Sequence, residues 1–126
     1  MIIGIGIDSA EIHRFAQWHT FSRKKLSRIF SDQEIDYCLQ LTHKSAERFA
    51  VRFAAREALF KALSVAFPDL FIPFLTLCKA VSIIKQKNRP EIIIDREMLS
   101  IKNHPYAVHL SLTHTNNIAT AFIIIE

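Results

Sequence analysis

The chain has 126 residues and a formal net charge of +4, and 50% of its residues are hydrophobic. That apolar content excludes a disordered chain, and no apolar run reaches the ~18–20 residues of a membrane-spanning helix, so we expect no membrane insertion. Two cysteines without a Cys-x-x-Cys spacing argue against a disulfide framework or a structural zinc site, which favours a reducing cytoplasm. The length predicts a single domain over residues 1–126, and the positive charge favours an anionic partner.

The chain begins with a predicted strand. Residues 2–7 are rich in Ile and apolar on both faces, which is typical of a buried strand, and we expect Asp8 to end it. The only two glycines of the chain, Gly4 and Gly6, lie inside this strand. Glycine within a strand often marks a place where another backbone approaches closely, so we expect such a contact beside Asp8.

Helical patterns follow this strand. Apolar spacing predicts a helix over 9–18 and a short one that Ser22 could cap. The segment Ser31-Asp-Gln-Glu34 has the form of a capping box, which predicts another helix beginning there. The longest helical pattern runs from about 45 to 66, and Pro68 fits its end.

The rest of the chain indicates mainly strands and turns. We expect a loop over 69–78 and a short helix over 96–103. Alternating apolar residues predict strands over 79–85, 91–95, 106–113 and 118–125, with turns at Pro90 and at Asn116-Asn117. An N-terminal strand, several helices with one long central helix, and C-terminal antiparallel strands together indicate an α+β protein.

Two carboxylates stand out by their positions. On a helical wheel Glu57 shares an arc with Phe53 and Phe60, where a carboxylate loses solvation unless something compensates. Lys61, one turn later, could pair with Glu57 at the edge of this face; otherwise Glu57 faces a metal or a ligand. Asp8 could be a helix N-cap, or it could hold Mg²⁺ together with Glu57, several waters and substrate phosphates.

Basic residues form two groups. Arg48, Arg52 and Arg56 are spaced by four, so they share a face of the long helix that is either solvated or suited to phosphate. The second group would suit an acidic protein or a nucleic acid and comprises Arg14, Arg23, Lys24, Lys25 and Arg28.

The segment Ser111-Leu-Thr-His114-Thr115 ends a predicted strand and enters a turn. A nucleophilic Ser111 activated by His114 would lack a glycine-rich elbow and an oxyanion signature, so a polar turn is favoured on pattern alone. Gly4-x-Gly6 lacks the third glycine of a dinucleotide fingerprint.

Four segments together resemble the holo-[acyl-carrier-protein] synthases, the small type of 4'-phosphopantetheinyl transferase. They follow the order of the family motifs, cover nearly the whole chain, and comprise Gly4–Arg14, Ile29–Cys38, Arg52–Leu63 and Ser111–Thr115. The third segment is the most specific, because the acidic residue and the lysine of the family motif are in register at Glu57 and Lys61.

The resemblance implies Mg²⁺-dependent transfer of the 4'-phosphopantetheine group from coenzyme A to a serine of apo acyl carrier protein, in fatty acid biosynthesis. The second product would be adenosine 3',5'-bisphosphate. Asp8 and Glu57 would bind the metal, and Glu57 and Lys61 would be catalytic. Arg52, Lys61 and His114 would bind coenzyme A, which is a substrate.

The resemblance also implies partners. The acidic carrier protein would be received by basic residues of the N-terminal region, namely Arg14, Arg23, Lys24 and Arg28. Members of the family are typically homotrimers with active sites between subunits, so we expect some contacts to come from a neighbouring copy. The resemblance implies no nucleic acid partner.

The chain departs from the family pattern in several places. Val51 and Asn88 stand where the family usually has glycine, and Arg56 stands where it usually has lysine. An apolar stretch over 64–78 replaces a glycine-rich one, so we expect turns or the wall of the coenzyme A pocket to be built differently there.

Two other functions stay open on the residues alone. A basic nucleic-acid-binding module would use the two groups of basic residues, but it leaves Glu57 on an apolar arc unexplained. A metal-dependent hydrolase would use Asp8, Glu57 and His114 to cleave a diphosphate with water as the acceptor.

Overall fold

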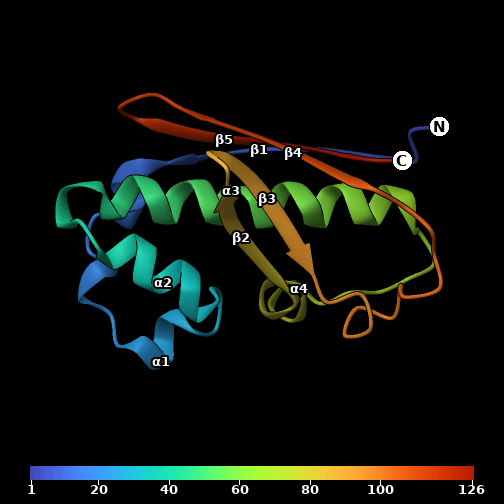
Figure 1. Cartoon of the computed structure of the whole chain (residues 1–126), viewed down its shortest axis with the longest axis horizontal. Helices are drawn as coiled ribbons and strands as arrows, with labels where there is room; N and C mark the ends of the chain where they lie inside the picture. The colour runs from blue at the N-terminus through green and yellow to red at the C-terminus, as the bar shows by residue number, and fades with distance from the viewer.

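The computed structural model describes residues 1–126 and places one long helix against an antiparallel sheet (Figure 1). The helix is α3, Thr42–Ala66, and the strand order of the sheet is β1 (Gly4–Glu11), β5 (Ile118–Ile125) and β4 (Val108–His114). This mixture of helices and antiparallel strands, with a long central helix and C-terminal strands, confirms the α+β prediction. None of the helices combines the length and the apolar character needed to cross a membrane.

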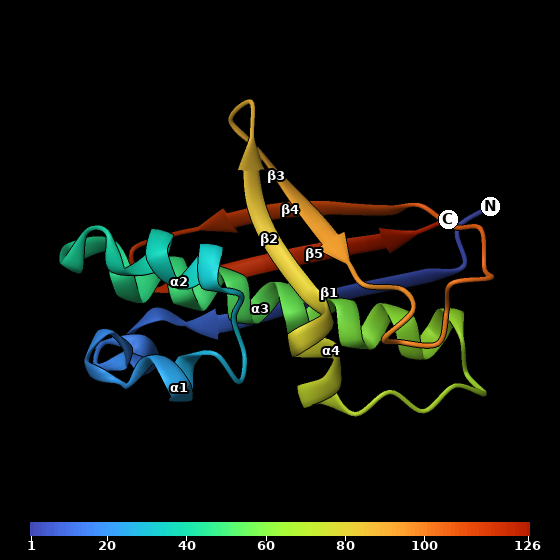
Figure 2. The ribbon, with the colours of Figure 1, turned by 60° about the horizontal axis from the view of Figure 1, so that its bottom comes forward.

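The remaining elements lie mostly on the side of α3 away from the sheet (Figure 1). They are the short helices α1 (Arg23–Leu26), α2 (Asp32–Leu39) and α4 (Phe74–Ala80) and the hairpin of β2 (Val81–Gln86) and β3 (Arg89–Ile94). Figure 2 shows the hairpin crossing α3 and projecting beyond the sheet, with the two chain ends close together at the far end of the sheet.

Strand β1 packs on α3 through its two glycines. A Cβ at Gly6 would overlap the carbonyl oxygen of Ala58, and one at Gly4 would overlap that of Ala62. Both glycines have negative φ, so backbone approach, and not an unusual conformation, is what requires them. The predicted close contact is therefore confirmed, and the backbone that approaches is α3.

The predictions for the strand's burial and end are wrong. Only one face of β1 is covered by α3, and Ile5 and Ile7 on the other face are 51% and 58% exposed in the single chain. Asp8 does not end the strand, because antiparallel pairing with β5 continues to Glu11. That pairing comes from the C-terminal end of the chain, so no local pattern around Asp8 reveals it.

No helix spans 9–18, which contradicts the prediction. After β1 the chain makes two short 3₁₀ turns, η1 (Ile12–Phe15) and η2 (Trp18–Thr20). Phe15, one of the residues whose spacing suggested a helix, instead joins Trp18 in an aromatic cluster with Phe49 and Phe53 of α3, so its apolar position reflects core packing.

The helices that start from a cap were predicted correctly. The Ser22 hydroxyl accepts a hydrogen bond from the Lys25 amide and starts α1. Ser31 and Glu34 form both hydrogen bonds of a capping box at the start of α2. Helix α3 ends at the predicted residue and begins one turn earlier than predicted, at Thr42.

A buried ion pair joins α2 to α3. The guanidinium of Arg56, which is wholly buried, donates to both carboxylate oxygens of Glu34 and to the carbonyl oxygens of Cys78 and Val81. Arg48, Arg52 and Arg56 therefore do not form one exposed face. The interpretation of that row as a phosphate-binding stripe is wrong for Arg56, whose donors are used inside the protein.

The second half of the chain agrees with the sequence in its strands and differs in its connections. The hairpin turn lies at Lys87 and Asn88, which adopt positive φ, whereas Pro90 is within β3. Residues 74–80 form α4 where a loop was expected, because Leu77 and Cys78 are buried against the core. Residues 96–103 form turns and no helix.

Candidate active site

Asp8 faces α3, on the same side of β1 as the two glycines. The Lys61 ammonium donates hydrogen bonds to Asp8 Oδ1 at 2.7 Å and to the Ile7 carbonyl oxygen at 3.1 Å. Glu57, one helical turn before Lys61, lies close enough to Asp8 for the Asp8 charge to act on the Glu57 carboxyl group. Asp8 is thus not a helix N-cap, and the direct partner of Lys61 is Asp8. The fold brings together three of the predicted site residues.

Glu57 has an electrostatic setting that resists ionisation. Partial burial raises the pKa of its carboxyl group, and the negative charge of Asp8 raises it further. The charges of Arg14 and Lys61 act in the opposite direction. The pKa of Lys61 is also raised, first by its hydrogen bond to Asp8 and then by the charges of both carboxylates. A cation between the two carboxylates would relieve their repulsion.

The chemistry of this donor set fits Mg²⁺. The chain has no group of three or more His, Cys, Asp and Glu side chains that could enclose a metal. Mg²⁺, however, commonly takes only one or two carboxylates and completes its shell with water and substrate phosphates. Asp8 and Glu57 meet that requirement, and Lys61 beside them supplies a further positive charge.

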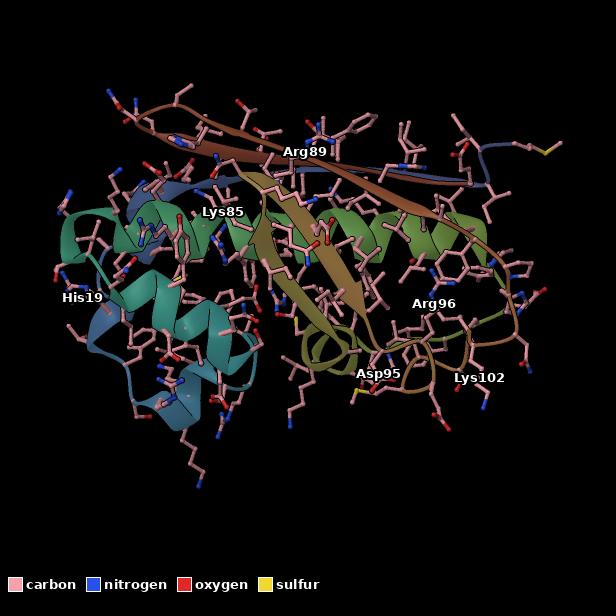
Figure 3. The ribbon with its side chains drawn as sticks, viewed as in Figure 1. His19, Lys85, Arg89, Asp95, Arg96 and Lys102 are labelled. Carbon is pink, nitrogen blue, oxygen red and sulfur yellow. The ribbon has the colours of Figure 1, made fainter.

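A second set of predicted residues lines a pocket of about 380 Å³ between α3, the β2–β3 hairpin and β4. Arg52 and His114 both lie in its wall, with three further cations, Lys44, Arg48 and Lys85. Figure 3 shows Lys85 on the side of β2 that faces α2 and the first half of α3. The pocket is therefore strongly positive and suited to an anionic ligand.

The aromatic ring of Tyr37 organises these cations. The guanidinium carbons of Arg48 and Arg52 lie 3.9 and 4.6 Å from the ring centroid, and Lys85 Nζ lies 5.4 Å from it. Burial acts to raise the pKa of the Tyr37 phenol, but the surrounding positive charges outweigh it, so the pKa is lowered. On the opposite wall, His114 Nε2 lies 3.2 Å from a Glu47 carboxylate oxygen.

The two sets of residues do not meet within one chain. Arg52 precedes Glu57 by five residues, which separates them by about 140° around the helix. None of Asp8, Glu57 and Lys61 lines the pocket that holds Arg52 and His114. The carboxylates and the cationic pocket therefore lie on different sides of α3.

The predicted partner-binding residues are exposed on and around η1 and α1. Arg14, Lys24 and Arg28 form no ion pair within the chain, whereas Arg23 binds Asp32 and Asp36. The hydrogen bond to Asp36 is the main cause that raises the pKa of Arg23. The charge of Arg14 also acts to lower the pKa of Glu57, so the Arg14 end of this basic patch lies near that carboxyl group.

Several pocket residues were not predicted. Tyr37 lies within a segment that carries the family resemblance, but only its position between Arg48, Arg52 and Lys85 gives it a role. Lys44 extends the four-residue spacing of Arg48 and Arg52 by one turn of α3, which is a signal that could have placed it. Lys85 comes from β2 and reaches the pocket only in the folded chain. Ser111, considered as a nucleophile, is exposed on the outer face of β4 and forms no hydrogen bond to His114.

Comparisons with known proteins agree on the family. Residues 4–123 match the model of the 4'-phosphopantetheinyl transferase superfamily. The holo-[acyl-carrier-protein] synthase of Treponema denticola is 35% identical, over 100% of this chain and 99% of its own. The synthase of Helicobacter pylori, solved in complex with coenzyme A, is 30% identical with a TM-score of 0.72 and covers 97% and 99% of the two chains.

A third relative extends the structural comparison. The holo-(acyl-carrier-protein) synthase of Bacillus anthracis, solved in complex with coenzyme A (3',5'-ADP), is 28% identical with a TM-score of 0.76. The alignment covers 99% of this chain and 96% of the relative. The resemblance seen in the sequence motifs is therefore confirmed along nearly the whole length.

Proposed function

The chain belongs to the 4'-phosphopantetheinyl transferase superfamily and is an enzyme of the holo-[acyl-carrier-protein] synthase type, and we propose that its activity is Mg²⁺-dependent. In this proposal it transfers 4'-phosphopantetheine from coenzyme A to a serine of apo acyl carrier protein and releases adenosine 3',5'-bisphosphate. The observation that carries the proposal is the grouping of Asp8, Glu57 and Lys61 where β1 packs on α3.

In the proposed reaction, Asp8 and Glu57 hold the metal. Bound Mg²⁺ would neutralise charge on the diphosphate and help to align it for attack. The raised pKa of Glu57 supports this assignment, because a carboxylate crowded by a second carboxylate is stabilised when a cation binds.

Lys61 acts beside the carboxylates. Its ammonium is oriented by hydrogen bonds to Asp8 and to the Ile7 carbonyl, and its raised pKa keeps it charged at neutral pH. We assign it to the diphosphate, where its charge stabilises negative charge that develops as the serine oxygen attacks the β-phosphorus and the bond to the bisphosphate breaks. In this proposal the serine gives up its proton, as its oxygen attacks, to the Glu57 carboxylate or to a water at the metal.

Coenzyme A binds in the cationic pocket in this proposal. Arg52 and His114 have donors that suit phosphate, and Lys44, Arg48 and Lys85 add positive charge around them. Because this pocket and the carboxylates lie on different faces of α3, we propose that coenzyme A bridges two copies of the chain.

The outer face of the sheet offers the surface for assembly. It carries exposed Ile5 and Ile7 of β1 with Phe122 and Ile124 of β5 beside them, which is a row of apolar side chains that nothing in the single chain covers. We propose that this face joins three copies in a homotrimer, whose closed ring would give every copy the same two neighbours.

The acidic carrier protein docks, in this proposal, on the exposed basic patch formed by Arg14, Arg23, Lys24 and Arg28. The proximity of Arg14 to Glu57 supports this placement, because it puts the patch next to the reacting groups. Long-range attraction would speed association and weaken as salt is added. We further propose one domain and a role in fatty acid biosynthesis in the cytoplasm, a reducing setting that suits the free thiols of Cys38 and Cys78.

The test of the metal assignment is Glu57→Gln, measured by modification of apo carrier protein with coenzyme A and Mg²⁺. We expect the variant to keep its fold and assembly and to lose activity by about a thousandfold or more, in the range seen when a group that stabilises the transition state is lost. Glu97→Gln, a change of an exposed carboxylate elsewhere, is the matched control. Full activity of Glu57→Gln would refute the assignment.

The shared site is tested by mixing two impaired variants at a coenzyme A concentration too low for the Arg52 variant to bind it. The Glu57→Gln and Arg52→Met chains are co-expressed in equal amounts. If each site joins two copies at random, about one site in four contains both an intact Glu57 and an intact Arg52. We expect about a quarter of wild-type activity from the mixture. Activity no higher than that of the separate variants would place both groups in one chain.

A further inference from the structure

Glu34 is a carboxylate with no access to solvent. Its Oε2 accepts a hydrogen bond from Arg56 Nη1 at 2.8 Å, and Arg56 Nη2 binds Oε1. Oε1 also accepts from the Ser31 amide at 2.9 Å and from the Ser31 hydroxyl at 3.0 Å. The position of the carboxylate is therefore determined by groups on α2 and α3 together.

A second guanidinium depends on the same carboxylate. Arg52 Nε lies 4.0 Å from Glu34 Oε2, and the Arg52 side chain is only 7% exposed. Nε is buried without a hydrogen-bond partner, and Nη1 donates only to the Arg48 carbonyl oxygen, at 3.3 Å. The ring of Tyr37 covers the guanidinium. The single negative charge of Glu34 therefore balances two buried positive charges, those of Arg52 and Arg56.

The two arginines are held very differently. Arg56 has three carbonyl partners besides Glu34, those of Arg52, Cys78 and Val81. Arg52 has one carbonyl partner, that of Arg48, and its guanidinium lies in the wall of the cationic pocket. Arg56 therefore anchors Glu34, while Arg52 keeps unused donors for a ligand.

We propose that Glu34 is a positioning residue for coenzyme A, which acts by holding the Arg52 guanidinium at the wall of the pocket. This inference rests on the proposed function, because it takes coenzyme A as the ligand of the pocket. Glu34 itself touches no ligand in this account.

The physical reason is the charge balance of the buried cluster. Without the Glu34 charge, two guanidiniums would face each other with no anion between them, and an unpaired buried charge is strongly disfavoured. Arg56 is retained by its carbonyl partners, so Arg52 is the side chain that turns toward solvent. Ligand binding weakens while the groups around Glu57, on another face of α3, keep their geometry.

The experiment is a double-mutant cycle on ligand binding. Glu34→Gln and Arg52→Met are made singly and together, and adenosine 3',5'-bisphosphate and coenzyme A are titrated by calorimetry. We expect Glu34→Gln to weaken binding about tenfold or more when Arg52 is present and less than about twofold in the Arg52→Met protein. In turnover, KM for coenzyme A rises by a similar factor while kcat changes little.

Two further variants separate charge from structure. Glu34→Asp keeps the charge, so we expect binding within about threefold of wild type, whereas a purely steric role would make it as harmful as Glu34→Gln. Asp36→Asn removes an exposed carboxylate from the same helix and leaves the affinity for the bisphosphate unchanged. If Glu34→Gln does not fold, the cycle is run with Glu34→Asp. We expect its smaller loss of ligand affinity to disappear in the Arg52→Met protein.

The outcomes are distinguishable. Equal weakening by the Glu34 change with and without Arg52, or a fall in kcat with an unchanged KM, overturns the positioning role and leaves the proposed function standing. Failure of the wild-type protein to bind either coenzyme A or the bisphosphate overturns the proposed function, and this inference with it.

Discussion

Replacing a strand glycine by Ala usually stabilises a protein, but we expect Gly6→Ala to destabilise this one. Gly6 lies in β1 with a negative φ, a conformation that Ala adopts without strain. At such a position the change ordinarily stabilises a protein by about 0.4–1 kcal/mol, because it restricts the unfolded chain. The contact between β1 and α3 reverses this expectation.

The size of the effect follows from what the new methyl group would meet. The Cβ would overlap the Ala58 carbonyl oxygen and lie 2.9 Å from both the Ala58 carbonyl carbon and the Ala62 amide nitrogen. All three are backbone atoms of a buried helix, so no side chain can turn aside. Overpacking typically costs about 1–3 kcal/mol and occasionally more, and a clash with backbone belongs at the upper end.

Thermal unfolding at one fixed protein concentration measures this directly. A loss of about 3 kcal/mol lowers Tm by roughly 10 °C for a chain of this size. The control is to add Ala58→Gly, which removes a methyl group and leaves the clashing carbonyl, so it should not restore stability. An unchanged or raised Tm for Gly6→Ala would refute the reasoning.

Three more predictions concern the core and the assembly. Arg56→Lys replaces a guanidinium that binds both Glu34 oxygens by a single ammonium, which leaves Glu34 poorly paired. We expect chemical denaturation to show a loss of about 3–5 kcal/mol in the free energy of unfolding. A loss below about 1 kcal/mol would contradict this. Burial raises the pKa of Cys38 to about 12 and that of Cys78 to about 11, so the folded chain holds these protons after the unfolded chain has lost them. Stability should therefore fall above pH 9, by up to about 1.4 kcal/mol per pH unit for each thiol, and less steeply in Cys38→Ala; the same slope in both proteins would count against the assignment. Ile7→Glu puts a charge on the exposed sheet face, and sedimentation should show it as a monomer if that face joins the copies; an unchanged assembly would exclude this face.

Features that depend on neighbouring residues could be predicted from the sequence. The capping box at Ser31 and Glu34, the end of α3 and the last strand follow from local spacing and local hydrogen bonds. The close approach at Gly4 and Gly6 was also foreseen, because glycine in a strand has few other reasons to be present.

Features that depend on partners far away in the sequence could not be predicted. Strand β1 continues past Asp8 because β5 pairs with it, and α4 forms because Leu77 is buried by the core, neither of which leaves a local signal. In the site, the pairing of Asp8 with Glu57 was one of two open alternatives, and the Asp8–Lys61 contact was not predicted. Glu57 and Lys61 share a helix face and were paired by spacing, but Asp8 joins them only in the folded chain, 53 positions from Lys61.

Arg56 shows the limit of helical spacing as evidence for a site. Its period of four with Arg48 and Arg52 suggested one phosphate-binding face, yet its guanidinium is buried against Glu34. Whether an arginine on such a face is a ligand or part of the core depends on a carboxylate from another helix, which the spacing does not reveal.

The most direct test of the account is the mass of a carrier protein. Incubated with this enzyme, coenzyme A and Mg²⁺, apo acyl carrier protein should gain about 340 Da, the mass of one phosphopantetheine group. The gain should disappear when Mg²⁺ is chelated, when the acceptor serine is replaced by alanine, and when the enzyme carries Glu57→Gln. An unmodified carrier protein with the wild-type enzyme, or a gain that persists without Mg²⁺, would contradict the account.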